Sequence, residues 1–359
     1  MTAARDRTGF LRSAAGVAAV ACVIGLQASG ARPNATQREA GAQAATRGPS
    51  LGQKAPGLKP ELFAPGVVST GIFERDVAMT PDGREFYFSA GFRAVTTIMV
   101  TRLRDGIWTA PEVASFATDP AYFYMEPCVS HDGRRIFFLT TRPRAGQAPK
   151  PGWGNNSIWA ADRNADGTWG EPYDLGPPIN GPDLTYFPSI TSDGTLYFSR
   201  AKVPGKDSAI YRSRLAGGRY QEPERLPDSV NGAGLIYNAF VAPDESYLIA
   251  GVEGREDSTP PKRANYYVFF RNADGTWTSG TNLGPAINDP ANTQHSPYVS
   301  PDGRFFFFSS NAPAEPAVPS LKGLTHARLV ELNSSPRNGN SDIFWVDARI
   351  IQELRRTGR

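Results

Sequence analysis

The sequence contains little cysteine, little histidine and little net charge, and each shortage excludes a class of protein. Two cysteines among 359 residues cannot form a disulfide framework, and three histidines without zinc-type spacing argue against a metal centre. Lysine and arginine number 38 against 35 aspartates and glutamates, and this scattered excess leaves no basic stripe to follow a nucleic-acid backbone. No Gly-x-Ser-x-Gly elbow and no glycine-rich phosphate loop occurs. The sequence therefore predicts no metal, no cofactor and no nucleic-acid partner.

Residues 1–30 have the features of a secretory signal peptide. Arg5, Arg7 and Arg12 precede an apolar run at residues 14–26, and small residues follow it. This run is too short to span a bilayer as a helix. We therefore expect cleavage near Gly30, a mature chain without a membrane span, and a periplasmic or extracellular location; a lipoprotein attached through Cys22 is the alternative. Residues 31–59 are rich in Ala, Gly, Gln, Pro and Thr, and they predict a disordered linker.

A tight turn followed by an aromatic strand occurs five times in the rest of the chain. The best copy, at residues 300–309, reads Ser-Pro-Asp-Gly-Arg-Phe-Phe-Phe-Phe-Ser. Proline fixes φ at the first turn position, aspartate bonds the downstream backbone, and glycine takes the position that needs a positive φ. The turn aspartates are Asp82, Asp132, Asp193, Asp244 and Asp302. Their separations of 50, 61, 51 and 58 residues indicate an array of similar units.

All five units have the pattern of three strands and the first four units add a fourth, which is typical of a propeller blade. A short strand precedes the turn, the aromatic strand follows it, and two alternating strands come later in the unit. The fifth unit lacks a fourth strand, and residues 60–70 resemble the missing one, so we expect the N-terminal strand to close the ring. The sequence predicts an all-β, five-bladed β-propeller of four-stranded antiparallel blades over residues 60–351, followed by a tail at 352–359. Six blades are the alternative.

The repeat resembles that of a known family. Residues 298–304, Tyr-Val-Ser-Pro-Asp-Gly-Arg, followed by an aromatic strand and by Ser-Asp-Ile-Phe at 341–344, are similar to the WD40-like β-propeller repeat of TolB-type periplasmic proteins. The spacer at 169–180, echoed at 283–288, is similar to spacers of small secreted members. The resemblance implies a propeller that binds or scaffolds. The chain departs from TolB itself by showing five repeats where TolB has six and by lacking its α/β domain.

The first strand of each blade lines the central channel of a propeller, so its residues are candidates for ligand binding at the channel mouth. Counting back from the turns gives a mixed set of acids, cations, amides and aromatic side chains, namely Glu74, Arg75, Asp76, Tyr124, Glu126, Tyr186, Tyr237, Asn238, Gln294 and His295. Such a set suits hydrogen bonding and stacking on a protein segment or a carbohydrate. The alternative is that the charged members only solvate the channel mouth.

Two chemical alternatives remain open at this stage. A glycoside hydrolase or lyase needs two carboxylates, which Asp76 with Glu126 or Glu74 could supply. The run at 162–167 matches the start of a calcium loop, although Tyr173 stands where that loop has its glutamate. Neither pattern is specific. The sequence therefore favours a binding or scaffolding module over an enzyme.

Overall fold

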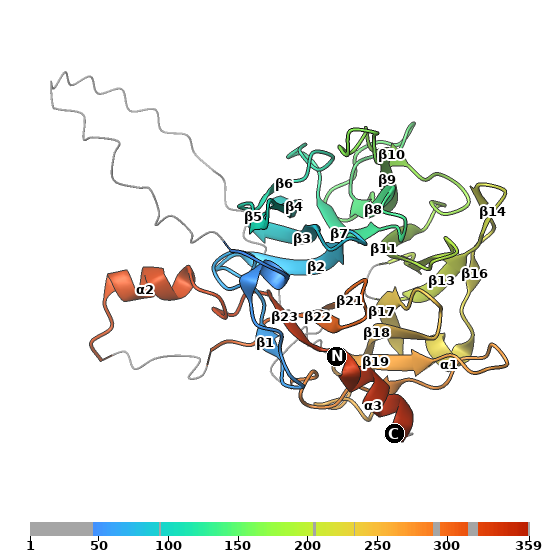
Figure 1. Ribbon diagram of the computed structural model, residues 1–359. Helices are drawn as coiled ribbons and strands as arrows, with labels where there is room; N and C mark the ends of the chain where they lie inside the picture. Colours follow the sequence, from blue (N-terminus) through green and yellow to red (C-terminus); the bar gives the residue numbers. More distant parts are fainter. Residues whose placement is uncertain are drawn as a thin grey trace, which may run out of the picture. The chain divides into compact units, whose positions relative to one another are not determined.

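The computed structural model describes residues 46–92, 95–203, 206–232, 234–289, 295–314 and 322–357. They form five mainly antiparallel four-stranded sheets in a ring, the architecture of a five-bladed β-propeller (Figure 1). This confirms the predicted fold with five blades in place of the six-bladed alternative. The predicted signal peptide lies outside the described residues.

Each blade runs from an inner strand to an outer strand. Blade 1 contains β2 (Phe73–Met79), β3 (Glu85–Phe92), β4 (Val95–Arg104) and β6 (Glu112–Val113), with β5 (Ile107–Trp108) also on β4. Blade 2 contains β7 (Tyr124–Val129), β8 (Arg135–Thr140), β9 (Ser157–Asp162) and β10 (Tyr173–Asp174). Blade 3 contains β11 (Leu184–Ile190), β12 (Leu196–Ala201), β13 (Ala209–Ser213) and β16 (Glu224–Arg225), with a hairpin of β14 (Leu215–Ala216) and β15 (Arg219–Tyr220). Blade 4 contains β17 (Leu235–Val241), β18 (Tyr247–Glu253), β19 (Asn265–Phe270) and β20 (Thr281–Asn282). Blade 5 contains β21 (His295–Val299), β22 (Phe305–Ser310), β23 (Asp342–Asp347) and β1 (Glu61–Leu62).

The inner strands form a closed circuit around the middle of the ring. β2 contacts β7, β7 contacts β11, β11 contacts β17, β17 contacts β21, and β21 returns to β2. Large aromatic side chains fill the space between neighbouring blades. Phe138 of blade 2, for example, stacks at 4.8 Å on Phe116, which comes from the link after blade 1. The hydrophobic core therefore lies between the blades, and the inner-strand side chains are left to line the channel.

The repeated turns close the hairpin between the first and second strands of a blade. In the first copy, Asp82 Oδ1 accepts hydrogen bonds from Thr80 Oγ1 at 2.6 Å and from Arg84 N at 3.0 Å. In the degenerate fourth copy, Glu245 occupies the glycine position with a φ of 56°. Its carboxylate accepts a hydrogen bond from the Tyr197 hydroxyl of blade 3 at 2.7 Å. The glutamate thus links two blades, which accounts for a residue other than glycine at this turn.

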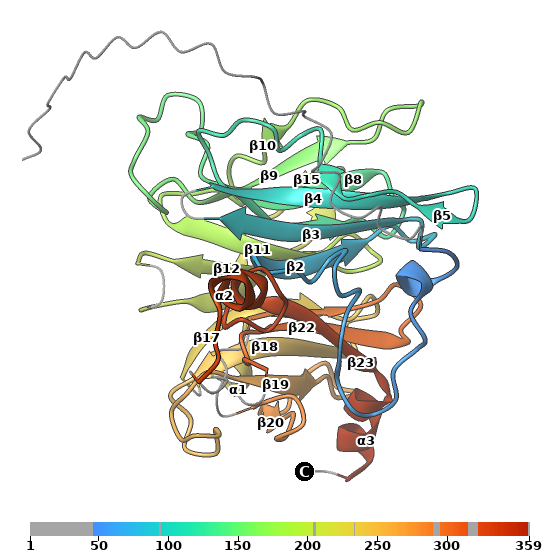
Figure 2. The same ribbon diagram turned by 90° about the vertical axis from the view of Figure 1, so that its left-hand side faces the viewer.

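The ring is closed by the N-terminal strand, as predicted. β1 pairs with β23 in antiparallel register, with Glu61 opposite Trp345 and Leu62 opposite Phe344. The next residue, Phe63, is almost fully buried, and its ring lies 4.9 Å from that of Phe86 in blade 1. Figure 2 shows β2, β3 and β4 of blade 1 above β22 and β23 of blade 5. The seam between these two blades is therefore packed with aromatic side chains on both sides.

Several segments differ from the sequence expectations. Part of the predicted linker, residues 46–59, packs on the ring, because Leu51 is buried and Trp108 Nε1 donates to Gly48 O at 2.8 Å. Residues 352–357 of the predicted tail are the end of α3 (Arg349–Thr357), which buries Ile351. The helix α2 (His326–Asn333) occupies part of the long loop of blade 5 and stands away from the ring (Figure 1). Two short helical turns, η1 (Ser50–Gly52) and α1 (Asp228–Asn231), complete the described elements. Within the described ranges, no helix has the length and apolar character needed to cross a membrane.

Candidate functional site

Every inner strand contains one residue with a positive φ at the same place. These residues lie six positions before their turn aspartate, have φ values from 51° to 65°, and are Asp76, Glu126, Phe187, Asn238 and Ser296. The pairing with the second strand shifts register at each of them, which defines a β-bulge. Successive side chains of a regular strand point to opposite faces. The bulge instead lets Met125 and Glu126 line one cavity, and likewise Tyr237 and Asn238.

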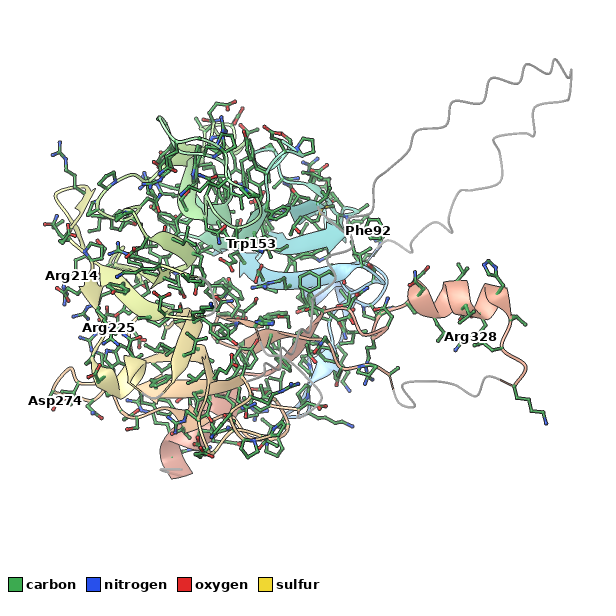
Figure 3. All side chains as sticks on the ribbon, turned by 180° about the vertical axis from the view of Figure 1, so that it is seen from behind. Phe92, Trp153, Arg214, Arg225, Asp274 and Arg328 are labelled. Carbon is green, nitrogen blue, oxygen red and sulfur yellow. The ribbon has the colours of Figure 1, made fainter. Side chains whose placement is uncertain are left out.

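At the bulged side of the ring lies a cavity of about 490 Å³. The inner strands contribute Arg75, Met125, Glu126, Tyr186, Tyr237, Asn238 and His295. The surrounding loops and strand ends contribute Leu139, Trp153, Asn156, Leu235, Glu253, Arg263 and Ala264. Figure 3 shows Trp153 near the middle of the ring. Beyond the bulges, between the second halves of the inner strands, lies a space of only about 50 Å³, lined largely by apolar residues that include Pro127, Pro188 and Pro297.

A charged cluster forms the centre of the cavity. Arg75 Nε lies 2.8 Å from Asp76 Oδ1, and Arg75 Nη2 lies 3.5 Å from Glu126 Oε1. Glu126 Oε2 accepts a hydrogen bond from Phe187 N at 2.7 Å, and Ser296 Oγ donates to Asp76. Burial raises the pKa of Glu126 well above its ordinary value, the Asp76 charge raises it further, and Arg75 opposes this shift. The cluster therefore joins four blades and favours the neutral form of Glu126.

The other inner-strand side chains of the cavity are uncharged at neutral pH. Burial and the nearby Arg75 charge lower the pKa of His295 to about 4, so its imidazole is neutral. The ring of His295 lies 6.2 Å from that of Tyr237. Burial raises the pKa of Tyr186 to about 12, and its hydroxyl lies 2.6 Å from Ser208 Oγ. These groups offer flat surfaces and hydrogen bonds to a ligand without adding charge.

The candidates from the sequence fall into four groups. Six line the cavity, namely Arg75, Glu126, Tyr186, Tyr237, Asn238 and His295. Asp76 is 2% exposed, and its carboxylate accepts a hydrogen bond from Arg75 Nε. Glu74 and Tyr124 precede the bulges and lie off the cavity: Glu74 accepts a hydrogen bond from Thr70, and Tyr124 packs 6.1 Å from Phe138. Gln294 lies outside the described residues.

Sequence reasoning missed the residues that the loops bring to the cavity. Trp153 and Asn156 belong to the connection between β8 and β9, while Glu253 ends β18 and Arg263 precedes β19. The only local signal was a tryptophan between two glycines in a proline-rich loop, a setting that keeps a large aromatic side chain out of a strand. Within the described residues, no group of three or more His, Cys, Asp or Glu side chains is arranged to hold a metal ion.

Glu74 and Asp342 are buried acids at the seam between blades 1 and 5. Burial raises the pKa of Glu74 to about 8, the hydrogen bond from Thr70 opposes the shift, and Asp342 adds to it. Burial likewise raises the pKa of Asp342 to about 6. Glu74 Oε2 and Asp342 Oδ1 have no hydrogen-bond partner among the described residues. Ionising either group therefore costs stability.

We expect Glu74→Gln to flatten the pH dependence of stability. An unfolded glutamate ionises near 4.5, whereas folded Glu74 keeps its proton to about pH 8, so the stability of the wild type falls as the pH rises through this window. Glutamine carries no charge at any pH. Urea denaturation should show equal stability at about pH 4 and a variant that is more stable by ~2 kcal/mol or more at about pH 8. Parallel pH profiles would contradict this expectation, and Glu61→Gln, at an exposed position on β1, is the control.

No protein-family model and no curated protein sequence matches the chain. Similar solved structures include TolB from Acinetobacter baumannii, with 15% identity and a TM-score of 0.42 over 77% of this chain and 57% of that chain. A periplasmic gluconolactonase from Pseudomonas aeruginosa matches with 15% identity and a TM-score of 0.39 over 66% of this chain and 65% of that chain. An α-L-arabinanase from Cellvibrio cellulosa, complexed with arabinohexaose, matches with 14% identity and a TM-score of 0.39 over 67% and 87%. The chain spans less than two thirds of the TolB and gluconolactonase chains, and these likenesses concern the fold alone.

Proposed function

We propose that the protein is an exported binding module that holds a protein segment or a carbohydrate in the cavity at the channel mouth. The observation that carries this proposal is the convergence of six inner-strand candidates from all five blades on one cavity. A concave site of this size, with apolar walls and a few converging polar groups, is typical of ligand binding. The ligand-binding residues are then Arg75, Glu126, Tyr186, Tyr237, Asn238 and His295, with Asp76 as their support.

The family and location belong to the same proposal. The Ser-Pro-Asp-Gly-Arg corner at 300–304 and its four relatives support membership of the TolB-like secreted propellers with WD40-like repeats. The arginines and the apolar run of residues 1–30 support export to the periplasm or the cell exterior, with a mature chain that begins near residue 31. A ligand outside the cell would then reach the cavity directly.

The carboxylate pairs that the sequence suggested for glycoside hydrolysis or lysis do not meet across the cavity. Hydrolysis needs two carboxyl groups that flank the scissile bond. The Asp76 side chain has 0% exposed surface and is engaged by Arg75 and Ser296, so it does not face a substrate. Glu74 lies off the cavity at the seam of the ring. Neither pair suggested by the sequence, Asp76 with Glu126 or Asp76 with Glu74, therefore faces a substrate across the cavity.

A large side chain that fills the cavity should weaken ligand binding. Leu235 is half-buried in the cavity wall, and Leu235→Trp would extend a large ring into it. We expect wild-type protein to bind a member of a defined set of oligosaccharides and hexapeptides in calorimetry, and the variant to bind it about tenfold more weakly or worse. Val113→Trp, at an exposed position of β6, is the matched control and should bind as wild type. Equal binding by the two variants would contradict the proposal, and so would the absence of any ligand among both the oligosaccharides and the hexapeptides.

A further inference from the structure

Trp153 forms a flat apolar platform at the rim of the cavity. It is one of the exposed large hydrophobic side chains, with 43% of its surface accessible, although tryptophan is ordinarily buried on average. Its ring packs against that of Phe123, with 5.0 Å between the ring centres. The turn of Gly154 N onto Pro151 O at 3.3 Å shapes the loop that carries it. An exposed indole at the rim of a cavity is suited to stacking on a ligand.

Asn156 lines the same cavity and has a buried acceptor without a partner in the described part of the chain. The residue is only 8% exposed, it lines the cavity, and its Oδ1 has no hydrogen-bond partner among the described residues. A buried acceptor without a donor costs stability in the free protein. The backbone holds this side chain in place, because Asn156 N donates to Trp153 O at 3.2 Å and Asn156 O accepts from Thr185 N at 3.4 Å. Oδ1 has almost no accessible surface in the free protein, so the amide must turn toward the cavity for a ligand hydroxyl or N–H to satisfy it.

The charges that line the cavity balance one another. Arg75 is engaged by Asp76 and Glu126, and the raised pKa of Glu126 favours its neutral form. The lining contains one further cation, Arg263, and one further acid, Glu253, so their charges cancel in the sum. A ligand with a net charge would find no excess of the opposite sign to compensate its desolvation. The mixed donors and acceptors instead match hydroxyl groups, which both donate and accept hydrogen bonds.

We propose, on the basis of the binding function above, that the ligand of this cavity is an uncharged saccharide. One sugar ring stacks on Trp153, and a hydroxyl of the same or the next ring donates to Asn156 Oδ1. The inner-strand groups of Arg75, Tyr237 and Asn238 then bind the end of the saccharide that reaches the centre of the ring. The cavity volume of about 490 Å³ lies in the range of sites for small ligands.

Calorimetry and tryptophan fluorescence on the purified mature protein test this proposal. The probes are neutral hexasaccharides of glucose, xylose, mannose and arabinose, with oligogalacturonate and chitosan oligomers as charged counterparts and a pool of hexapeptides as a third arm. We expect a neutral hexasaccharide to bind and to change the fluorescence of Trp153. Trp153→Ala should weaken binding about tenfold or more, and Trp153→Phe should restore part of it. Phe92→Ala removes an aromatic side chain that is 63% exposed outside the cavity, and it should bind as wild type.

Asn156→Ala separates a ligand contact from a structural role. If Oδ1 accepts a hydrogen bond from a ligand hydroxyl, the variant should bind the ligand roughly fivefold more weakly than wild type. Its melting temperature should stay equal or rise, because the substitution removes an unpaired buried acceptor. A preference for the charged oligomers, or binding of hexapeptides alone with the same sensitivity to Trp153→Ala, would overturn the saccharide proposal and leave the binding function standing. Failure of all three arms would overturn both.

Discussion

Phe63→Ala is expected to lower the free energy of unfolding by about 3–5 kcal/mol, which is a large part of the stability of an ordinary domain. Phe63 follows the closing strand and is 1% exposed. Its ring lies 5.1 Å from those of Phe307 and Trp345 in blade 5 and 4.9 Å from Phe86 in blade 1. Alanine would leave a cavity between aromatic groups that strands hold apart, so the site cannot collapse to fill it. Guanidinium denaturation followed by circular dichroism measures the loss.

The same substitution should loosen the closure of the ring before the other blades unfold. β1 pairs with β23 through two residues only, so aromatic packing contributes most of what holds it. Limited proteolysis should therefore cut Phe63→Ala near residues 55–70 under conditions in which wild type stays intact. Leu58→Ala, at a position in the same arm that is 44% exposed, is the control and should stay within ~0.5 kcal/mol of wild type. A loss for Phe63→Ala no larger than that of the control would show that closure contributes little.

The sequence predicted this closure because the blades are repeats. Three of the four fourth strands start at a proline, and residues 60–62, Pro-Glu-Leu, supplied the missing copy next to the last strand, Asp342–Asp347. The turns were equally predictable, since proline, aspartate and glycine each meet a specific backbone requirement there. Repetition also placed the ligand candidates, because the bulges keep a constant distance of six residues from the turn aspartates.

The bulges themselves left no signal in the sequence. The five residues with positive φ have acidic, aromatic, amide and hydroxyl side chains, and none is glycine. Only asparagine and aspartate favour this region, which costs other residues about 1–2 kcal/mol. Contacts between blades stabilise the conformation instead: Glu126 N donates to Asp76 Oδ2 at 3.3 Å, and Asn238 N donates to Ser199 Oγ at 3.0 Å. Such contacts exist only once the ring has formed.

The loop residues of the cavity were unpredictable for a different reason. The connection between β8 and β9 is much longer than the turns, and its residues 141–156 have no periodic pattern that would orient Trp153 or Asn156. Residues 46–59 also gave no pattern of ordered structure, because their position depends on two buried apolar residues, Leu51 and Pro56, and on backbone hydrogen bonds to the ring. Pattern and propensity report on local structure, whereas these segments are positioned by the surface on which they lie.

Arg75→Met is expected to destabilise the protein by about 3–5 kcal/mol at neutral pH, because it leaves the buried Asp76 carboxyl without the cation beside it. The Asp76 side chain is 0% exposed, and Arg75 Nε lies 2.8 Å from it. Methionine keeps an unbranched side chain of similar length, so the loss reports charge more than packing. Guanidinium denaturation measures it. Arg304→Met removes an exposed guanidinium that lies 5.1 Å from the ring of Phe305, and it should change stability by no more than ~0.5 kcal/mol.

The loss should grow with pH, and this dependence identifies its cause. Burial and Asp76 raise the pKa of Glu126, and Arg75 lowers it, so removal of Arg75 raises this pKa further. A carboxyl whose folded pKa exceeds its unfolded value loses stability as the pH rises from the ordinary carboxyl range toward the folded pKa. Folded Glu126 keeps its proton up to about pH 8 in the wild type, so the gap between wild type and Arg75→Met should stay constant below that pH and widen above it, where the wild type ionises Glu126 more readily than the variant does. Adding Asp76→Asn should recover much of the loss, since asparagine tolerates the φ of 54° and can still accept the hydrogen bond from Glu126 N. A loss that is equal at every pH and is not recovered by Asp76→Asn would instead assign the effect to packing around residue 75, and would contradict the ion cluster as the centre of the ring.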